Sequence, residues 1–208
     1  MLNYYNDFWE KRNFKQCDDF PYKWPCLKKY IPTEPNIKIV DFGCGAGQLI
    51  LKLKKINPGS HYIGLDVSQE VIKRNRKKFA DHKFYLIKDG GKLPFRNNSI
   101  DYIISADSIE HVYNTEFTFR EFARVLKPGG KGIITTPYHG FFKNLAIILT
   151  NNFDLSFDPI APHIRFFTKS SISKCLNKVG LKPIKYDYFG RFYPLSRGML
   201  IIGEKAEA

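Results

Sequence analysis

Short apolar runs alternate with longer amphipathic stretches from residue 37 to the end of the chain. The apolar runs are rich in β-branched residues, which is typical of strands buried on both faces of a sheet. Between them, apolar residues recur at helical spacing, as Leu49, Ile50 and Leu53 do. The expected strands are 37–42, 61–66, 84–88, 100–106, 131–136, 181–188 and 199–204, and the expected helices are 49–56, 68–79, 115–126 and 170–179.

This order predicts an α/β fold: a doubly wound, Rossmann-like, seven-stranded and mostly parallel sheet with helices on both faces. Only the turn FGRFYPLSRG separates the last two strands, which favours a C-terminal antiparallel hairpin. We expect a single domain, 1–208, with a cofactor-binding core at 37–137 and a substrate-side segment at 138–208. Residues 1–36 precede the alternation, and their aromatic residues predict a helical cap or lid: Tyr4, Tyr5, Phe8 and Trp9.

Composition supports one core, because 208 residues with 43% hydrophobic content can bury it without disulfides. The four cysteines have no zinc-ligand spacing, the N-terminus has no apolar signal region, and no run is long enough to span a bilayer. We therefore expect a soluble, cytoplasmic protein without a metal.

A net charge of +13 raises the question of nucleic-acid or membrane binding. The basic residues are 24 Lys and only 9 Arg, whereas phosphate recognition favours Arg. The densest run, 73–78, lies on a predicted helix with apolar Val71, Ile72 and Phe79. We expect a solvated helix face, and nucleic acid is an unlikely partner that the charge does not exclude.

The sequence VDFGCGAGQ places three glycines at every second position directly after a predicted strand. Gly43, Gly45 and Gly47 would let backbone amides at a helix start approach an anionic group. The spacing is neither GxGxxG nor GxxxxGK, the patterns of dinucleotide and phosphate sites. Asp41 would repel a pyrophosphate but could hold an ammonium group, so we expect a zwitterionic ligand such as an amino acid.

Two further carboxylates end the next strands. Asp66 is placed to accept hydrogen bonds from ribose hydroxyls. Asp89 could accept from an exocyclic amine while the Gly90 amide donates to a ring nitrogen, which describes adenine. Each aspartate alone could be a turn residue, but together with the glycines they predict a site for S-adenosylmethionine (SAM).

At these residues the sequence resembles the class I SAM-dependent methyltransferases, through VDFGCGAGQ, IGLDVS, LIKDGGKLPFRNNSIDYIISADSIEHV and EFARVLKPGG. SADSIEHV, TTPYHGFFKNL and HIRFFTKSSISKCLNKVGL are similar to small methyltransferases akin to ubiquinone- and menaquinone-biosynthesis methylases. The resemblance implies a seven-stranded sheet whose last hairpin inserts one antiparallel strand, SAM as cofactor and S-adenosylhomocysteine as product. It implies that Asp41, Gly43 and Gly45 contact the methionine moiety, Asp66 the ribose and Asp89 the adenine. The remaining cofactor-binding candidates are Cys44, Gly47, Val67, Gly90, Ala106 and Asp107.

His111 is the candidate general base, because it follows the fourth strand and imidazole titrates near neutral pH. It could equally cap or pack the next helix, and Glu110 could orient it or face solvent. Substrate candidates in other connections at the ligand edge are Tyr138, His139, His163 and Arg165. Arg165 suggests an anionic or carbonyl group on the substrate.

The apolar stretch Phe141 to Phe153 could contact a hydrophobic substrate or a membrane, but its length favours a core helix. We expect a methyltransferase that acts on a small molecule, such as a lipid, a quinone-like compound or a secondary metabolite. A quinone is not secured, because the chain lacks the extended N-terminal helical region of the longer quinone enzymes. The alternatives are an RNA methyltransferase and a non-catalytic nucleic-acid-binding module. Neither an RNA-binding domain, nor an NPPY-type tetrapeptide after the fourth strand, nor an obligate protein partner is evident.

Overall fold

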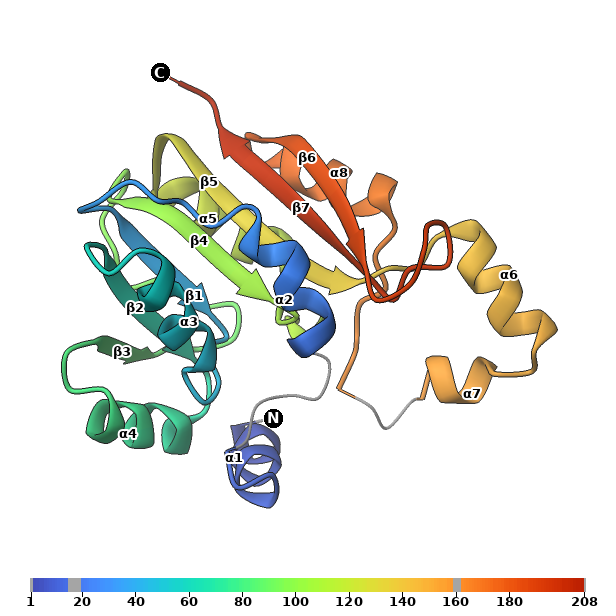
Figure 1. Ribbon diagram of the computed structural model, residues 1–208, viewed down its shortest axis with the longest axis horizontal. Coiled ribbons are helices and arrows are strands. Elements are labelled where there is room, and N and C mark those ends of the chain that lie inside the picture. The colour runs from blue at the N-terminus through green and yellow to red at the C-terminus, as the bar shows by residue number, and fades with distance from the viewer. Residues whose placement is uncertain (1, 15–19, 159–161, 208) are drawn as a thin grey trace.

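The computed structural model describes residues 2–14, 20–158 and 162–207. Its centre is a seven-stranded sheet in the order β3-β2-β1-β4-β5-β7-β6 (Figure 1). The strands are β1 Lys38–Phe42, β2 His61–Asp66, β3 Lys83–Leu86, β4 Ile100–Ala106, β5 Leu126–Pro137, β6 Leu181–Phe189 and β7 Gly198–Lys205. The helices are α1 Leu2–Lys11, α2 Phe20–Lys28, α3 Gln48–Ile56, α4 Gln69–Lys78, α5 Thr115–Val125, α6 Phe141–Leu149, α7 Phe153–Ser156 and α8 Lys169–Lys178, with a 3-10 helix, η1, at Ile109–His111.

The predicted topology is confirmed. Strands β3, β2, β1, β4 and β5 are parallel, and β7 lies antiparallel between β5 and β6. Two apolar clusters cover the two faces of the sheet. One includes Phe119 of α5 and Leu176 of α8, and the other includes Leu27 of α2, Leu53 of α3 and Val71 of α4. The helices therefore lie on both faces, as the alternating pattern indicates.

Helix α4 shows how the sequence determines this packing. The Ser68 side chain caps it by accepting a hydrogen bond from the Val71 amide at 3.3 Å. Val71 and Ile72 are buried, whereas most of the basic run 73–78 faces outward. The run forms the solvated face that we expected.

Two elements differ from the expectation. The sequence KPGG lies inside β5 rather than before it, because Leu126 already pairs with Ile100 and the register shifts before Tyr102 pairs with Lys131. The glycines lie in this irregularity, where the register shifts, and the strand continues past them. Helix α2 lies within the expected helical cap 1–36 but was not assigned as a separate helix, since its sequence FPYKWPCLK contains an internal Pro25 and no clear periodicity.

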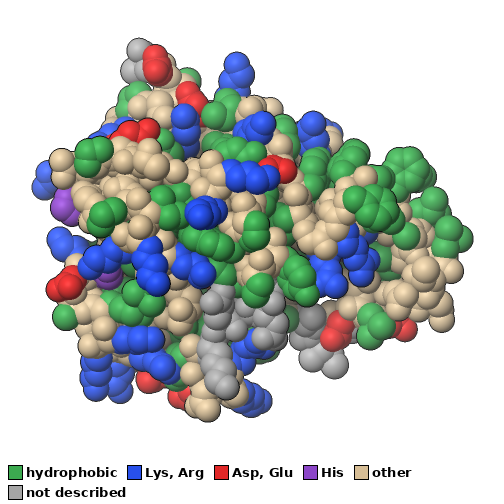
Figure 2. Space-filling model, in the orientation of Figure 1, with side chains coloured by type: hydrophobic (Ala, Val, Ile, Leu, Met, Phe, Trp, Pro, Cys, Tyr) green, Lys and Arg blue, Asp and Glu red, His purple; other side chains and the backbone are tan. Residues whose placement is uncertain are grey.

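The expectation of a core helix within 141–153 is wrong. Helix α6 has no buried residue, and Phe141 and Leu149 are 73% and 76% exposed. Other helices already cover both sheet faces, and α6 extends beyond them with α7 (Figure 1). Figure 2 shows hydrophobic side chains gathered at this end of the molecule. No helix in the described ranges has the length and apolarity that crossing a membrane requires.

Candidate active site

A cavity of about 480 Å³ opens beside the ends of β1, β2 and β4. Its size is that of a typical small-molecule site. It collects most of the residues expected to bind a cofactor: Asp41, Gly43, Cys44, Gly45, Asp66, Val67, Asp89, Gly90, Ala106 and Asp107, together with His111. The parallel strands produce this convergence, because their carboxyl ends meet at one edge of the sheet.

Asp41, the second-last residue of β1, has a buried carboxyl group and is only 2% exposed. Its Oδ2 has no hydrogen-bond partner among the described residues. Desolvation, and secondarily the nearby Asp66, raise the Asp41 pKa to about 8. A cationic group in the cavity would therefore satisfy the free oxygen and stabilise its ionised form.

Asp66 holds the glycine turn in place. Its Oδ2 accepts from the Gly45 amide and its Oδ1 from the Ser68 amide, both at 2.9 Å. Burial raises its pKa, and these hydrogen bonds act in the opposite direction. Each carboxylate oxygen has a further lone pair, so the group can still accept from a ligand.

The glycine turn corrects our expectation that its amides face a ligand. The amides of Gly43 and Cys44 donate to the Leu65 carbonyl at 2.8 and 2.9 Å, and Gly45 donates to Asp66. The turn amides therefore tie β1 to β2.

Gly43, Gly45 and Gly47 all adopt positive φ, at 74°, 44° and 76°, which glycine does at no steric cost. A side chain at each position would also clash with a different neighbour. A Cβ on Gly43 would lie 2.2 Å from Ser108 Oγ, and one on Gly45 would lie 2.4 Å from the Trp9 ring. A Cβ on Gly47 would meet Phe79 at 2.6 Å. Gly47 thus serves packing and does not line the cavity.

Asp89 and Asp107 occupy different environments. Asp89 is exposed at the rim, where its Oδ2 accepts from the Tyr113 amide at 3.3 Å. Asp107 forms an ion pair with the buried Lys23 of α2 and accepts from the Thr135 hydroxyl at 2.7 Å. Sequence reasoning missed Lys23, because α2 carries no recognisable pattern.

The aromatic side chains of α1 form one wall of the cavity, through Tyr5, Phe8 and Trp9. Trp9 lies against Gly45, and the Tyr5 ring packs edge-on to His111 at 6.2 Å between centroids. Helix α1 contacts α4, and Figure 1 shows it apart from the sheet. The described part of the predicted lid, 1–36, thus reaches the site.

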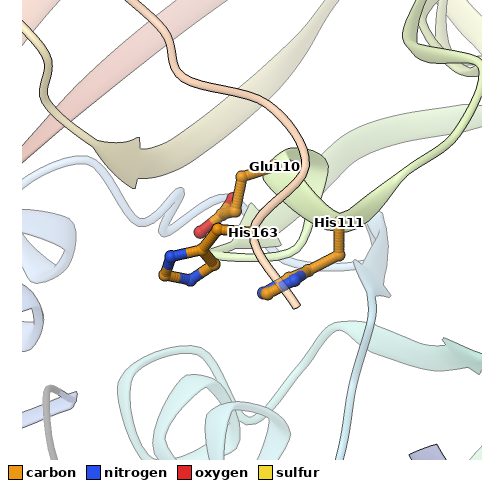
Figure 3. Close-up of side chains that lie close together, drawn as sticks. All are labelled: Glu110, His111 and His163. Atoms are coloured by element: carbon orange, nitrogen blue, oxygen red, sulfur yellow. The ribbon is translucent and has the colours of Figure 1, made fainter. Parts of the chain in front are cut away.

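Glu110, His111 and His163 lie together beside the cavity (Figure 3). His111 Nδ1 is 2.8 Å from the Pro162 carbonyl, and burial lowers the His111 pKa to about 4. Such a group is neutral at pH 7 but is a weak base. Glu110 is fully buried and its oxygens have no hydrogen-bond partner in the described structure, so it neither faces solvent nor orients His111.

The other substrate candidates lie outside the cavity lining. Tyr138 packs edge-on against Tyr188 at 5.1 Å, and His139 lies between Phe157 and Phe166. The Arg165 guanidinium donates to the carbonyls of Tyr113 and Ile164. It therefore ties its loop down, rather than pointing its donors at a substrate.

Comparisons with known proteins agree with this geometry. The model of the methyltransferase domain family matches residues 40–134. A demethylmenaquinone methyltransferase of Chlorobaculum tepidum is 28% identical over 174 residues, which cover 76% of this chain and 71% of that protein. A sterol 24-C-methyltransferase of Gibberella zeae is 30% identical over 109 residues, 50% of this chain and 28% of that protein.

Solved structures show the same fold. A SAM-dependent methyltransferase from Mesorhizobium loti superimposes with a TM-score of 0.68 at 18% identity, covering 88% of this chain and 97% of that one. The fold, the family match and the convergence of the strand-end carboxylates on one cavity agree. Together they support a class I SAM-dependent methyltransferase, an enzyme whose cofactor is SAM.

Proposed function

We propose that this enzyme transfers the methyl group of SAM to a small apolar acceptor that it meets at a membrane surface. The observation that carries the proposal is a cavity that has carboxylates at the strand ends and His111 and Pro162 in its lining. When bound, SAM supplies a methyl group on a positively charged sulfur, which a nucleophile can displace.

Each of the three carboxylates would bind a different part of SAM. Asp41 would bind the amino group, because its Oδ2 is buried without a partner among the described residues. Asp66 would accept from the ribose hydroxyls with the lone pairs that its backbone bonds leave over. Asp89, at the rim, would accept from the adenine amine.

The chain contributes positioning and exclusion of water. Positioning reactants in line supplies about 7–11 kcal/mol in favourable cases. The aromatic wall of α1 would act as a lid, since Trp9 lies over the glycine turn and Tyr5 reaches His111. His111 is the residue that would contact the acceptor at the reacting end.

The acceptor class follows from the exposed apolar side chains of α6 and α7, which we name the apolar arm: Phe141, Phe142, Leu145, Ile148, Leu149, Phe153 and Leu155. An unpartnered surface of this kind beside basic residues suits an anionic membrane interface. Lys143 of α6, Arg191 and Arg197 lie close enough that the two arginines help lower the Lys143 pKa to about 8, although the partial burial of the half-exposed Lys143 side chain is the larger cause. Two relatives carry the names of apolar substrates, demethylmenaquinone and a sterol, which also favours an apolar acceptor.

The activity test uses methyl-labelled SAM and an extract of the source cells, separated into lipid, polar, RNA and protein fractions. We expect label in the lipid fraction with the wild-type protein and about 10-fold less with Asp41→Ala when SAM is limiting. Label confined to RNA or protein would overturn the acceptor class.

Membrane contact is tested separately by sedimentation with anionic phosphatidylglycerol vesicles at low and high salt. We expect binding that falls with salt and is lost in Leu149→Ser. Leu86→Ser is the matched control, because Leu86 is also exposed but lies on β3 at the opposite edge of the sheet. Equal sedimentation of both variants would reject the apolar arm as the docking surface.

A further inference from the structure

Glu110, His111 and His163 converge from two segments that are far apart in sequence. The first two belong to η1 after β4, and His163 lies in the loop before α8. One ligating atom from each residue lies within 4.8 Å of the other two, and Figure 3 shows the side chains gathered around a common space. Two imidazoles and a carboxylate are a common ligand set for transition metals.

Glu110 needs a partner that the described residues do not provide. Its side chain is fully buried, and neither oxygen makes a hydrogen bond. The Thr136 hydroxyl is near but outside hydrogen-bonding geometry. The neighbouring charges, Lys23 and Asp107, are paired with each other. Buried carboxylates are normally paired or bound to a metal, because burying an isolated charge is costly.

His111 is already oriented as a ligand. A carbonyl oxygen only accepts hydrogen bonds, so the 2.8 Å contact with Pro162 requires the proton on Nδ1. In the neutral ring, Nε2 then carries the lone pair. A backbone carbonyl holding the second nitrogen is the usual support for a metal-bound histidine.

The backbone fixes the distance between the two segments. The Glu110 carbonyl accepts from the amides of Ile164 and Arg165 at 3.1 and 3.0 Å. The rings of His111 and His163 consequently lie 4.8 Å apart between centroids, at 41° to each other. The three side chains are thus held by hydrogen-bonded backbone rather than by a free loop.

We propose that Glu110, His111 and His163 bind one divalent transition metal, with zinc as the best match. Imidazole nitrogens favour zinc and its transition-metal neighbours over Mg²⁺ and Ca²⁺, which prefer oxygen. Three protein ligands leave a coordination position open, as in catalytic zinc sites. His111 also lines the cavity, so the open position would lie at the reacting end.

The site would select an acceptor with a hydroxyl group, such as a phenol or an enol; this part rests on the proposed methyl transfer. The hydroxyl oxygen would bind the metal through a lone pair and lose its proton to solvent water. The metal stabilises the resulting oxyanion, as it does a bound hydroxide. This supplies a nucleophile without a protein base, since His111 would itself be a metal ligand.

The test measures metal binding directly and needs no substrate. Tag-free protein is stripped with a chelator and dialysed against Zn²⁺, and bound metal is counted by atomic absorption. We expect about one Zn²⁺ per chain. Co²⁺ should give the visible absorption of a low-symmetry site without a thiolate charge-transfer band. Glu110→Gln and His163→Ala should each weaken binding more than about 10-fold.

His61→Ala is the matched control, because His61 is exposed at the start of β2, the opposite end from the site. It should bind zinc as the wild type does. Zinc binding that is absent in the wild type, or that persists in both site variants, would overturn the inference. SAM binding, measured by calorimetry on the metal-free protein, distinguishes this failure from failure of the proposed function, since Asp41 and Asp66 are not metal ligands here.

Discussion

The turns after β1 and β2 and the segment 138–167 both border the reacting end of the molecule, yet they are built in opposite ways. In the first region the backbone is tied inward, with Gly43, Cys44 and Gly45 all donating to the end of β2. In the second, α6 has no buried residue. The contrast indicates that cofactor recognition depends on a rigid scaffold, whereas acceptor delivery uses a surface that the core does not need.

The largest expected effect is on the free energy of unfolding, when one leucine from the scaffold and one from the segment 138–167 are each replaced by alanine. Leu53→Ala removes a fully buried side chain of α3 and should cost about 2–5 kcal/mol of unfolding free energy. Leu149→Ala, in the apolar arm, should change stability by less than about 0.5 kcal/mol. Urea unfolding of both variants checks this. A large loss of stability in Leu149→Ala would mean that α6 is packed against the protein in solution. The contrast between the two regions would then not hold.

Asp66→Ala tests the rigidity of the first region. It leaves the amides of Gly45 and Ser68 without their acceptor and removes the expected ribose contact. We expect SAM affinity to fall about 100-fold, because two hydrogen bonds to a charged group are worth about 1.5–3 kcal/mol each. Calorimetric titration with SAM measures the change.

Asp101→Ala is the control for that variant. Asp101 also accepts from a backbone amide, that of Lys38, and from Lys127, but at the other end of the sheet. It should lower stability while leaving SAM affinity unchanged. If Asp66→Ala and Asp101→Ala lose SAM affinity equally, the loss in Asp66→Ala comes from general destabilisation and not from a lost ribose contact.

Asp41→Asn separates binding from stability. The folded pKa of about 8 lies above the ordinary value, so the unfolded chain releases this proton as pH rises from about 4 while the folded chain retains it. The carboxyl therefore costs stability increasingly up to pH 8, and the full cost persists above it. Asparagine has no proton to release.

In the SAM-free protein, Asp41→Asn should therefore raise the melting temperature at pH 8.5 by roughly 4–8 °C, for about 2 kcal/mol. The gain should shrink towards pH 4, and SAM affinity should fall about 10-fold. Thermal melting from pH 4 to 9 provides the measurement. A gain that does not depend on pH would show that Asp41 is ionised in the empty protein.

Trp9→Ala should have the smallest effect. The indole lies over Gly45 and lines the cavity, so its loss should weaken SAM binding about 5-fold without lowering the melting temperature. Trp24→Ala is the matched control, because Trp24 stacks on the cavity-lining Phe20 but does not line the cavity itself. Unchanged SAM affinity in Trp9→Ala would remove the lid from the mechanism.

The sequence predicted what depends on local chemistry and strand order. Asp41 and Asp66 end parallel strands, so they meet in any doubly wound sheet. It could not predict what depends on tertiary contacts. The partners of the turn amides were misassigned, because the hydrogen bond from Gly45 to Asp66 joins residues 21 positions apart.

The apolar sequence of α6 is equally compatible with a core helix and an exposed one, since hydrophobicity does not reveal whether space on the sheet is left to cover. Likewise, nothing in the spacing of Glu110 and His163 indicates that they meet. Their proximity depends on two backbone hydrogen bonds to the Glu110 carbonyl.

The isolated parallel bridge between Tyr138 and Phe167 has a consequence for evolution. The His139 amide also donates to the Phe167 carbonyl at 3.0 Å, so the chain leaves the scaffold and returns to it at one point. An excursion with adjacent ends can lengthen, shorten or be exchanged at little cost in loop entropy. Changes in the length or sequence of this segment can thus alter the acceptor while leaving Asp41 and Asp66, which lie outside it, in place.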